Sequence, residues 1–141
     1  MAGNTTLTII KPDAFGAGKA GKIIALLEEK GFTIRGARVM QLTTAQAGEF
    51  YAIHKGRPFY AELVQFMTSG PCMPIVLEKS EAVSALRDAI GATDPAEAAP
   101  GTVRKLYAES KGRNAIHASD SDENAQREAR FFFAESDLLW G

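Results

Sequence analysis

Short apolar runs in this sequence alternate with stretches whose apolar side chains recur at helical spacing. The apolar runs predict buried strands at residues 7–10, 32–42 and 72–77, and a shorter fourth strand at residues 115–117. Within the second run the alternation of apolar and polar positions changes phase at Gly36, which predicts a β-bulge there.

The amphipathic stretches between these runs predict helices. Thr43 with Gln46 three residues later is a capping-box pattern, and Gly31 is the expected end of the first helix. Helices are expected at about residues 20–30, from Thr43 to about residue 51, at 60–67, from Ser80 to about residue 90, and from Asp120 to about residue 133. Residues 92–114 are expected to be mostly loop, and a loop of that length in a compact domain usually has a function.

The order of these elements favours an α+β fold. Strands and helices follow one another as β-α-β-α-α-β-α-β-α, which favours a sheet covered by helices on one face. The 141 residues contain no repeat, low-complexity tract or linker, so they suit a single domain spanning residues 1–141. A domain of this size buries a substantial apolar core without disulfides.

Composition and charge exclude several classes of protein. Hydrophobic residues make up 45% of the chain and charged residues 23%, which is too apolar for a disordered protein. Sixteen basic against seventeen acidic residues give a net charge of −1, so no overall field favours nucleic acid or an anionic membrane. No run approaches the roughly 20 apolar residues of a membrane helix.

The single cysteine and the first residues bear on location. Cys72 has no partner for an internal disulfide and stands in an apolar run, which favours a buried thiol over a nucleophile. The first residues lack the basic segment and apolar core of a secretory signal. These features predict a cytoplasmic protein.

Residues 16–22, GAGKAGK, are rich in glycine and precede a predicted helix. They match the dinucleotide-binding pattern G-x-G-x-x-G and nearly match the phosphate-binding P-loop pattern. However, five residues separate them from the strand end at Ile10, and no acidic residue follows about 20 positions later. Ile23 occupies the position at which a P-loop has Ser or Thr. A flexible turn is therefore favoured over either nucleotide-binding motif.

A histidine stands at the expected end of the fourth strand, just before a helix. The segment before His117 is locally basic, and the start of the following helix offers backbone N–H groups to an anion. Glu128 falls on the apolar side of that helix, where a carboxylate needs a partner. An imidazole is a suitable partner, because the carboxylate fixes its tautomer and raises its nucleophilicity. A lone histidine is more often structural, so this pattern leaves both roles open.

Basic and hydroxyl side chains stand at the ends of several predicted elements. Each alone is typical of a solvated surface. Together with the aromatic ring of Phe59 they are able to grip a polyphosphate and stack a base. The set comprises Lys11, Arg57, Arg87, Thr93 and Arg104.

These segments together resemble the nucleoside diphosphate kinase family over nearly the whole chain, from residue 6 to about residue 133. The segment 114–121, NAIHASDS, is similar to the family's active-site pattern N-x-x-H-G/A-S-D. Further matching blocks occur in the family's order: IKPD at 10–13, RPF at 57–59, SGP at 69–71, GATDP at 91–95 and PGTVR at 100–104. The histidine motif alone is moderately specific, whereas the ordered set is highly specific.

The resemblance implies a ferredoxin-like βαββαβ sandwich with a four-stranded antiparallel sheet covered by helices. It implies transfer of the γ-phosphate of a nucleoside triphosphate to a nucleoside diphosphate, by a ping-pong mechanism through a phosphohistidine on His117, with broad base specificity. Mg²⁺ is the implied cofactor, held mainly by the nucleotide phosphates rather than by a set of protein ligands. The implied partners are nucleoside tri- and diphosphates, and neither nucleic acid nor a membrane is required.

The resemblance assigns the family's phosphate-binding roles to residues of this chain that match its motifs. The resemblance implies that Lys11 contacts the γ-phosphate and a ribose hydroxyl. It implies that Arg87, Thr93 and Arg104 grip the terminal phosphates. Charge stabilisation of this kind is the chief requirement of phosphoryl transfer.

The remaining roles concern the nucleoside and the histidine. The resemblance implies that Asn114 binds the ribose and that Phe59 stacks on the base. Tyr51 is implied to help position the histidine and the phosphate. Ser119 and Glu128 are implied to hold the environment of the histidine.

Some features depart from the family's pattern or stay open. Lys111 stands where an apolar residue often lies near the base, and Lys105 replaces the small residue that often follows Arg104.

The resemblance implies homo-oligomers built from dimers, and the short tail leaves hexamer and tetramer open. Rival interpretations are a non-catalytic nucleotide-binding member of the same fold and an NADP-binding oxidoreductase fragment using residues 16–21. The filled catalytic positions disfavour the first rival, and the chain length disfavours the second.

Overall fold

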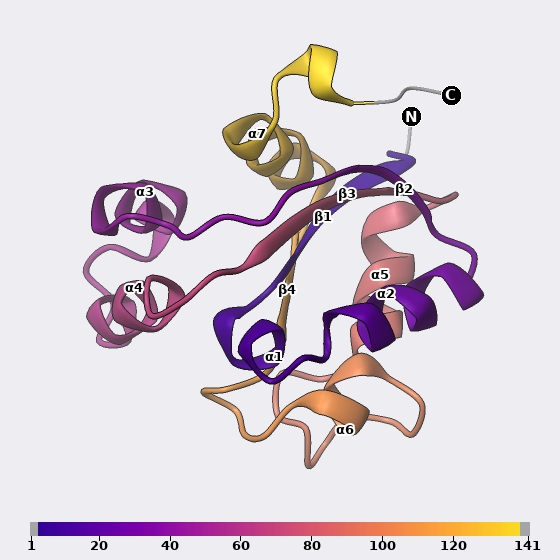
Figure 1. Cartoon of the computed structure of the whole chain (residues 1–141), viewed down its shortest axis with the longest axis horizontal. Coiled ribbons are helices and arrows are strands. Elements are labelled where there is room, and N and C mark those ends of the chain that lie inside the picture. Colours follow the sequence, from indigo (N-terminus) through magenta and orange to yellow (C-terminus); the bar gives the residue numbers. More distant parts are fainter. Residues whose placement is uncertain (1–2, 139–141) are drawn as a thin grey trace.

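A four-stranded antiparallel sheet with the strand order β2-β3-β1-β4 forms the centre of the computed structural model (Figure 1). The structure describes residues 3–138. The strands are β1 (Thr5–Ile10), β2 (Thr33–Ala37), β3 (Met73–Glu78) and β4 (Ile116–Ala118). Their order and pairing give a ferredoxin-like βαββαβ core, which confirms the predicted α+β fold.

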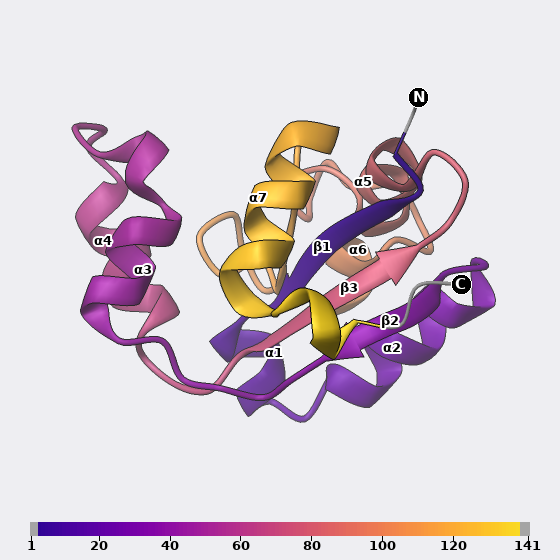
Figure 2. The ribbon, with the colours of Figure 1, turned by 90° about the horizontal axis from the view of Figure 1, so that it is seen from above.

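The helices lie around this sheet, with one pair set apart. In Figures 1 and 2 the third and fourth helices stand together at one end of the sheet, on the excursion of the chain between β2 and β3. The helices are α1 (Pro12–Gly16), α2 (Ala20–Glu29), α3 (Thr44–Phe50), α4 (Tyr60–Met67), α5 (Ala82–Ile90), α6 (Val103–Tyr107) and α7 (Asp122–Phe132), with short 3₁₀ turns η1 (Ala52–His54) and η2 (Glu135–Asp137). Within residues 3–138, no helix has both the length and the apolar character needed to cross a lipid bilayer.

Helices cover both faces of the sheet, so the expectation of helices on one face is wrong. One apolar core packs α2 and α5 against a face that includes Ile10 and Ile75. The other core packs the end of α7 against the opposite face, which includes Leu7 and Ile9. Figure 1 shows α7 on one side of the strands and α2 with α5 on the other. Residues 6–10 of β1 are all buried, Thr6 and Thr8 included, because this strand buries side chains on both faces.

The central position of β1 brings distant parts of the chain together. It pairs with β3 along its length and with β4 at its end, which places His117 opposite Ile9. The register of β2 against β3 shifts between Ile34 and Gly36, which confirms the predicted bulge. β2 ends earlier than predicted, and only an isolated bridge at Met40 continues the pairing, because the chain there turns away toward α3.

Most helix boundaries follow the capping signals. Thr43 and Gln46 form the predicted capping box at the start of α3, and α4 has the predicted bounds. The N-caps of α5 and α7 are Glu81 and Ser121, each one residue later than the predicted caps Ser80 and Asp120. Glu81, with φ +54, precedes α5, and the Ser121 side chain accepts a hydrogen bond from the third residue of α7.

The sequence pattern does not predict α1 and α6. Each spans five residues, which is too short to show a helical period. α6 begins after Thr102, whose side chain caps it, and it interrupts the region expected to be loop. α1 begins at Pro12 and separates β1 from the glycine-rich segment 16–22. That segment therefore does not form a phosphate-binding turn directly after a strand, as the dinucleotide and P-loop motifs require.

Candidate active site

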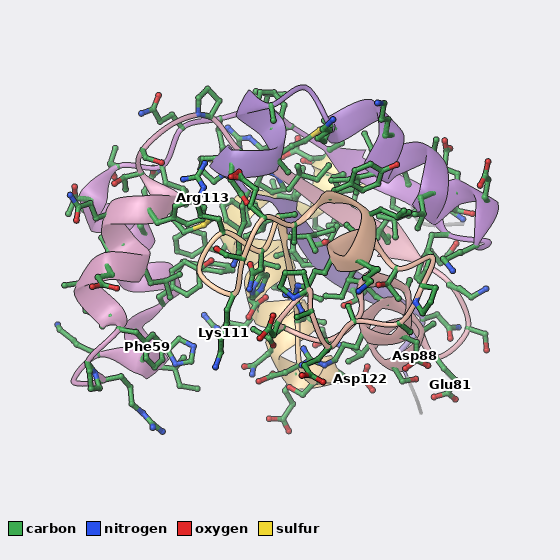
Figure 3. The ribbon with its side chains drawn as sticks, turned by 90° about the horizontal axis from the view of Figure 1, so that it is seen from below. Phe59, Glu81, Asp88, Lys111, Arg113 and Asp122 are labelled. Atoms are coloured by element: carbon green, nitrogen blue, oxygen red, sulfur yellow. The ribbon has the colours of Figure 1, made fainter. Side chains whose placement is uncertain are left out.

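A cavity of about 830 Å³ lies where the end of β1, β4, the α3–α4 pair and the loop before β4 meet. Figure 3 shows Phe59 and Lys111, which both line it, on two different segments: the turn before α4 and the loop before β4. Most residues assigned to the site from the sequence line this cavity. They are Lys11, Tyr51, Phe59, Arg87, Thr93, Arg104, Asn114, His117 and Glu128.

His117 lies at the centre of β4 and is largely buried. Its ring meets the rings of Phe50 and Tyr51 edge-on, and its Nε2 is 2.7 Å from Oε1 of Glu128. Burial lowers the pKa of His117, and the nearby cations lower it further, although Glu128 acts in the opposite direction. The imidazole is therefore neutral at neutral pH.

Glu128 is a buried carboxylate on the apolar face of α7, as the helical spacing predicts. Its Oε1 also accepts a hydrogen bond of 2.7 Å from Oγ of Ser119, which lies behind the cavity wall. Since an ionised carboxylate only accepts hydrogen bonds, the proton of the ring stays on Nε2 of His117. The other ring nitrogen, Nδ1, forms no hydrogen bond to the residues that the structure describes, and it keeps its lone pair.

Lys11 lies directly after β1, and its buried side chain reaches the cavity. Its Nζ donates a hydrogen bond of 2.8 Å to Oδ1 of Asn114. Burial, together with the charge of Arg104, lowers the pKa of Lys11 to about 8. An anion in the cavity would stabilise the charged form of this amine.

Arg104, on α6, is fixed by backbone carbonyls. Its guanidinium donates to the carbonyl oxygens of Gly91 at 3.0 Å and of Ile116 at 2.8 Å. Burial and the charge of Arg87 lower its pKa to about 10, so it remains charged at neutral pH. The side chain is thus a cation whose direction is set before any ligand arrives.

Arg87 on α5 and Thr93 just after that helix extend the cationic end of the cavity. Both are more exposed than Arg104. All three also line an adjoining hollow of about 430 Å³. The two hollows therefore share one positively charged wall.

Aromatic side chains line the opposite end. Phe59 is 47% exposed, and the ring of His54 lies between it and Tyr51, with centroid distances of 5.3 and 6.3 Å. His54 lines the cavity, although the sequence pattern did not indicate it. The one sign of it in the sequence is that His54 stands between Tyr51 and Phe59, which were both assigned to the site. Among the described residues, no group hydrogen-bonds the buried hydroxyl of Tyr51. Burial, reinforced by the charge of Glu128, raises the pKa of Tyr51 far above its usual value, so the hydroxyl keeps its proton.

Besides Ser119, three features singled out from the sequence lie outside the cavity. Arg57 does not line it, although its residue type suits a phosphate site. The glycine-rich segment 16–22 also contributes no lining residue. Cys72 is buried, and burial raises the pKa of its thiol to about 11, which confirms a core thiol rather than a nucleophile.

The arrangement combines three chemical functions in one cavity. A neutral imidazole presents a free nitrogen lone pair beside the fixed cations Lys11 and Arg104. An exposed aromatic ring stands at the other end. Such a cavity suits a molecule with a chain of phosphates at one end and a planar group at the other.

Known proteins share both the sequence and the fold. A family model described as nucleoside diphosphate kinase matches residues 4–138. A nucleoside diphosphate kinase from Chlorobium luteolum is 58% identical over 106 residues, which are 75% of this chain and 76% of that protein. The solved nucleoside diphosphate kinase of Aquifex aeolicus has a TM-score of 0.94 and 45% identity, and the match covers 96% of this chain and 99% of that one. A halophilic nucleoside diphosphate kinase from Halobacterium salinarum, solved in complex with CDP, has a TM-score of 0.92 and 38% identity over 97% of this chain and 92% of its own.

Proposed function

Because the chain belongs to the nucleoside diphosphate kinase family, it transfers the γ-phosphate of a nucleoside triphosphate to a nucleoside diphosphate, and we propose that His117 carries the phosphate between the two nucleotides. The orientation of the ring carries this proposal. Glu128 engages Nε2, and Nδ1 is left with a lone pair in a cavity that also holds Lys11 and Arg104. A neutral imidazole held in this way is an activated nucleophile.

In the first half-reaction Nδ1 of His117 attacks the γ-phosphorus. The nitrogen–phosphorus bond forms as the bond from that phosphorus to the bridging oxygen breaks, and its electron pair leaves with the nucleoside diphosphate. In the second half-reaction a terminal oxygen of another nucleoside diphosphate attacks the phosphohistidine, and the nitrogen–phosphorus bond breaks. Glu128 stabilises the positive charge that the ring gains while it is phosphorylated.

The cationic wall binds the phosphates in both halves of this cycle. Lys11 and Arg104 bind the transferred group, because they are buried and already fixed by hydrogen bonds. Arg87 and Thr93, which are more exposed, contact the terminal phosphates from the cavity edge. The Tyr51 hydroxyl, which keeps its proton, donates toward the histidine and phosphate.

The nucleoside occupies the opposite end. Oδ1 of Asn114 already accepts from Lys11, so its amide nitrogen is the group that binds the ribose. Phe59 stacks on the base, and stacking is tolerant of base identity because every base has an aromatic face. The Halobacterium relative was solved in complex with CDP, which is a nucleoside diphosphate.

Mg²⁺ fits this cavity as a companion of the nucleotide. Asp120 lines the cavity, and the hydrogen bond from Asn124 holds its pKa below the usual value, so an ionised carboxylate faces the phosphate region. Among residues 3–138 no group of three or more His, Cys, Asp or Glu side chains is placed to hold a metal ion. We propose that the nucleotide phosphates hold the ion and that the Asp120 carboxylate would assist them. When bound, the ion would neutralise phosphate charge.

Labelling with γ-labelled ATP in the absence of acceptor tests the proposal. We expect acid-labile label on His117, its release on addition of any nucleoside diphosphate, and no label on His117→Asn. His54→Gln, which changes the chain's other histidine, should still form phosphohistidine. Nucleotide binding without labelling would point to the non-catalytic rival and would overturn the proposal.

Two further properties follow from the same family membership. We propose a homo-oligomer built from dimers, as a hexamer or tetramer, because β2 pairs only with β3 within residues 3–138 and its outer edge suits a second copy. Light scattering after size exclusion measures this. We also propose a cytoplasmic location, which agrees with the free buried thiol of Cys72.

A further inference from the structure

A strained turn lies immediately before the strand of the histidine. Ala115 has a backbone φ of +74 and is fully buried. The N–H of Ile116 donates across it to the carbonyl of Asn114 at 2.9 Å. Together these define a γ-turn with positive central φ, a conformation that is rare and costly for a residue with a Cβ. Such a turn persists only where surrounding groups hold it.

Two residues at the junction of β1 and α1 hold Ala115 from opposite sides. The backbone N–H of Lys11 donates to the carbonyl of Ala115 at 2.9 Å. The N–H of Ala115 donates to Oδ2 of Asp13 at 3.0 Å. Both bonds are buried, so neither is easily replaced by water.

Asp13 has no direct access to the ligand. Its side chain is buried and does not line the cavity. Among the described residues no group hydrogen-bonds its second oxygen, Oδ1. The bond from Ala115 is therefore the interaction that accounts for this buried carboxylate.

We propose that Asp13 is a positioning residue for phosphoryl transfer, which acts by holding the γ-turn at Ala115 and so places His117. The proposal rests on the role of His117 proposed above. Asp13 supplies the acceptor that makes the positive φ of Ala115 the preferred backbone state.

The turn fixes more than the histidine. The side chain of Asn114, at its start, binds Nζ of Lys11. The carbonyls of Asn114 and Ile116, on either side of Ala115, both accept hydrogen bonds from Arg104. Relaxation of the turn would therefore shift the nucleophile relative to both phosphate-binding cations. A misplacement of about 1 Å is enough to slow a reaction on the order of 10²-fold.

The rate of phosphohistidine formation in a single turnover at saturating ATP measures this effect. Asp13→Ala removes the acceptor, and we expect the rate to fall roughly 10- to 100-fold. Asp13→Asn keeps an oxygen acceptor of the same reach, so its rate should stay within about fivefold of wild type. Circular dichroism and thermal melting verify that each variant is folded.

A glycine at position 115 provides the decisive rescue. Glycine adopts positive φ without the steric cost of a Cβ, so the turn no longer needs to be held. In Asp13→Ala, the added change Ala115→Gly should restore the rate by at least about fivefold. The matched control adds Ala17→Gly instead, at an exposed position with φ −84 where glycine relieves no strain. That double variant should stay as slow as Asp13→Ala.

Each outcome decides the proposal. Rescue by Ala115→Gly and not by Ala17→Gly supports it. A folded Asp13→Ala variant with the wild-type rate overturns it. If Asp13→Ala is slow, the proposal is also overturned when Ala115→Gly and Ala17→Gly both restore the rate, or when neither restores it. If Asp13→Ala does not fold, Asp13→Asn is compared with Asp13→Ser, whose shorter side chain places its oxygen farther from the N–H of Ala115. A rate for the serine variant about tenfold below that of the asparagine variant supports the proposal, and equal rates overturn it. Wild-type protein that forms no phosphohistidine would contradict the role of His117 instead.

Discussion

Glu128→Gln separates the charge of the buried carboxylate from its shape. In the structure one oxygen of Glu128 receives hydrogen bonds from both Ser119 and the His117 ring, each at 2.7 Å. A hydrogen bond to a charged group contributes about 1.5–3 kcal/mol, against about 0.5–1.5 kcal/mol for a neutral one. The neutral amide therefore weakens the bond to His117 by about 1.5 kcal/mol, which is roughly tenfold in rate.

Two further effects act in the same direction. Glu128 raises the pKa of His117 against the effect of burial, so its loss makes the ring less basic and a weaker nucleophile. The amide also presents a donor on one side, which favours the wrong tautomer of the ring. We therefore expect phosphohistidine formation to slow roughly 10- to 100-fold, the usual range for the loss of such a partner.

Single-turnover phosphorylation by ATP and calorimetric binding of nucleoside diphosphate test this expectation together. The affinity should change by less than about threefold, because the cations and the aromatic ring that bind nucleotide are untouched. Glu123→Gln is the matched control, since Glu123 is an exposed glutamate on the same helix. An unchanged rate in Glu128→Gln would refute the role derived from this hydrogen bond.

Three other expectations concern the rest of the cavity. Lys11→Ala should lower kcat/KM on the order of 10²-fold or more. Lys22→Ala, in the glycine-rich segment outside the cavity, should change kcat/KM by less than about threefold. If steady-state kinetics show that Lys22→Ala has the larger effect, the P-loop interpretation is favoured instead. Phe59→Ala should raise KM roughly 5- to 100-fold, by a similar factor for all four bases, and a loss confined to one base would contradict recognition by stacking alone. Since burial lowers the pKa of Lys11 to about 8, kcat/KM should fall as the pH rises through that value and the amine loses its charge. Because the pKa of His117 is also lowered, kcat/KM should stay constant as the pH falls through the usual titration range of histidine. A profile of kcat/KM from about pH 6 to pH 9.5 tests both expectations.

Local signals in the sequence were sufficient for elements with a full period or a clear cap. The Thr43 capping box and the bounds of α4 are examples, and the phase change at Gly36 located the bulge. The α1 and α6 helices were missed because five residues do not complete two turns of a helix. The order of elements alone did not show that both faces of the sheet are covered. The continuous apolar run at residues 74–77 of β3 contained that signal, because a strand with one solvated face alternates between apolar and polar residues.

Most of the residues assigned to the site from the sequence line one cavity, and there is a physical reason for this. Groups that bind phosphate or act as a nucleophile must be of particular residue types, and these types stand out from their neighbours in the sequence. Arg57 has such a type and lies outside the cavity, because residue type does not determine where a side chain points. His54 and Asp13 were missed for the opposite reason. The first contributes a ring to an aromatic wall, and the second acts through a backbone N–H that no sequence pattern shows.

The electrostatics of the cavity link phosphate binding to the state of the nucleophile. Burial lowers the pKa values of Lys11 and Arg104, and the charge of Arg104 adds to this at Lys11 as that of Arg87 does at Arg104. Burial also lowers the pKa of His117, and Lys11 and Arg104 lower it further. Positive charge is thus concentrated where no carboxylate of residues 3–138 forms an ion pair with Lys11 or Arg104, and a polyphosphate would relieve the repulsion on binding. The imidazole is kept neutral before a phosphate arrives, and in the proposed reaction the charge that the ring gains on phosphorylation is stabilised by Glu128, whose Oε1 lies 2.7 Å from Nε2. The arrangement therefore favours the phosphorylated ring over a merely protonated one, because only the first brings its own negative charge to the cations.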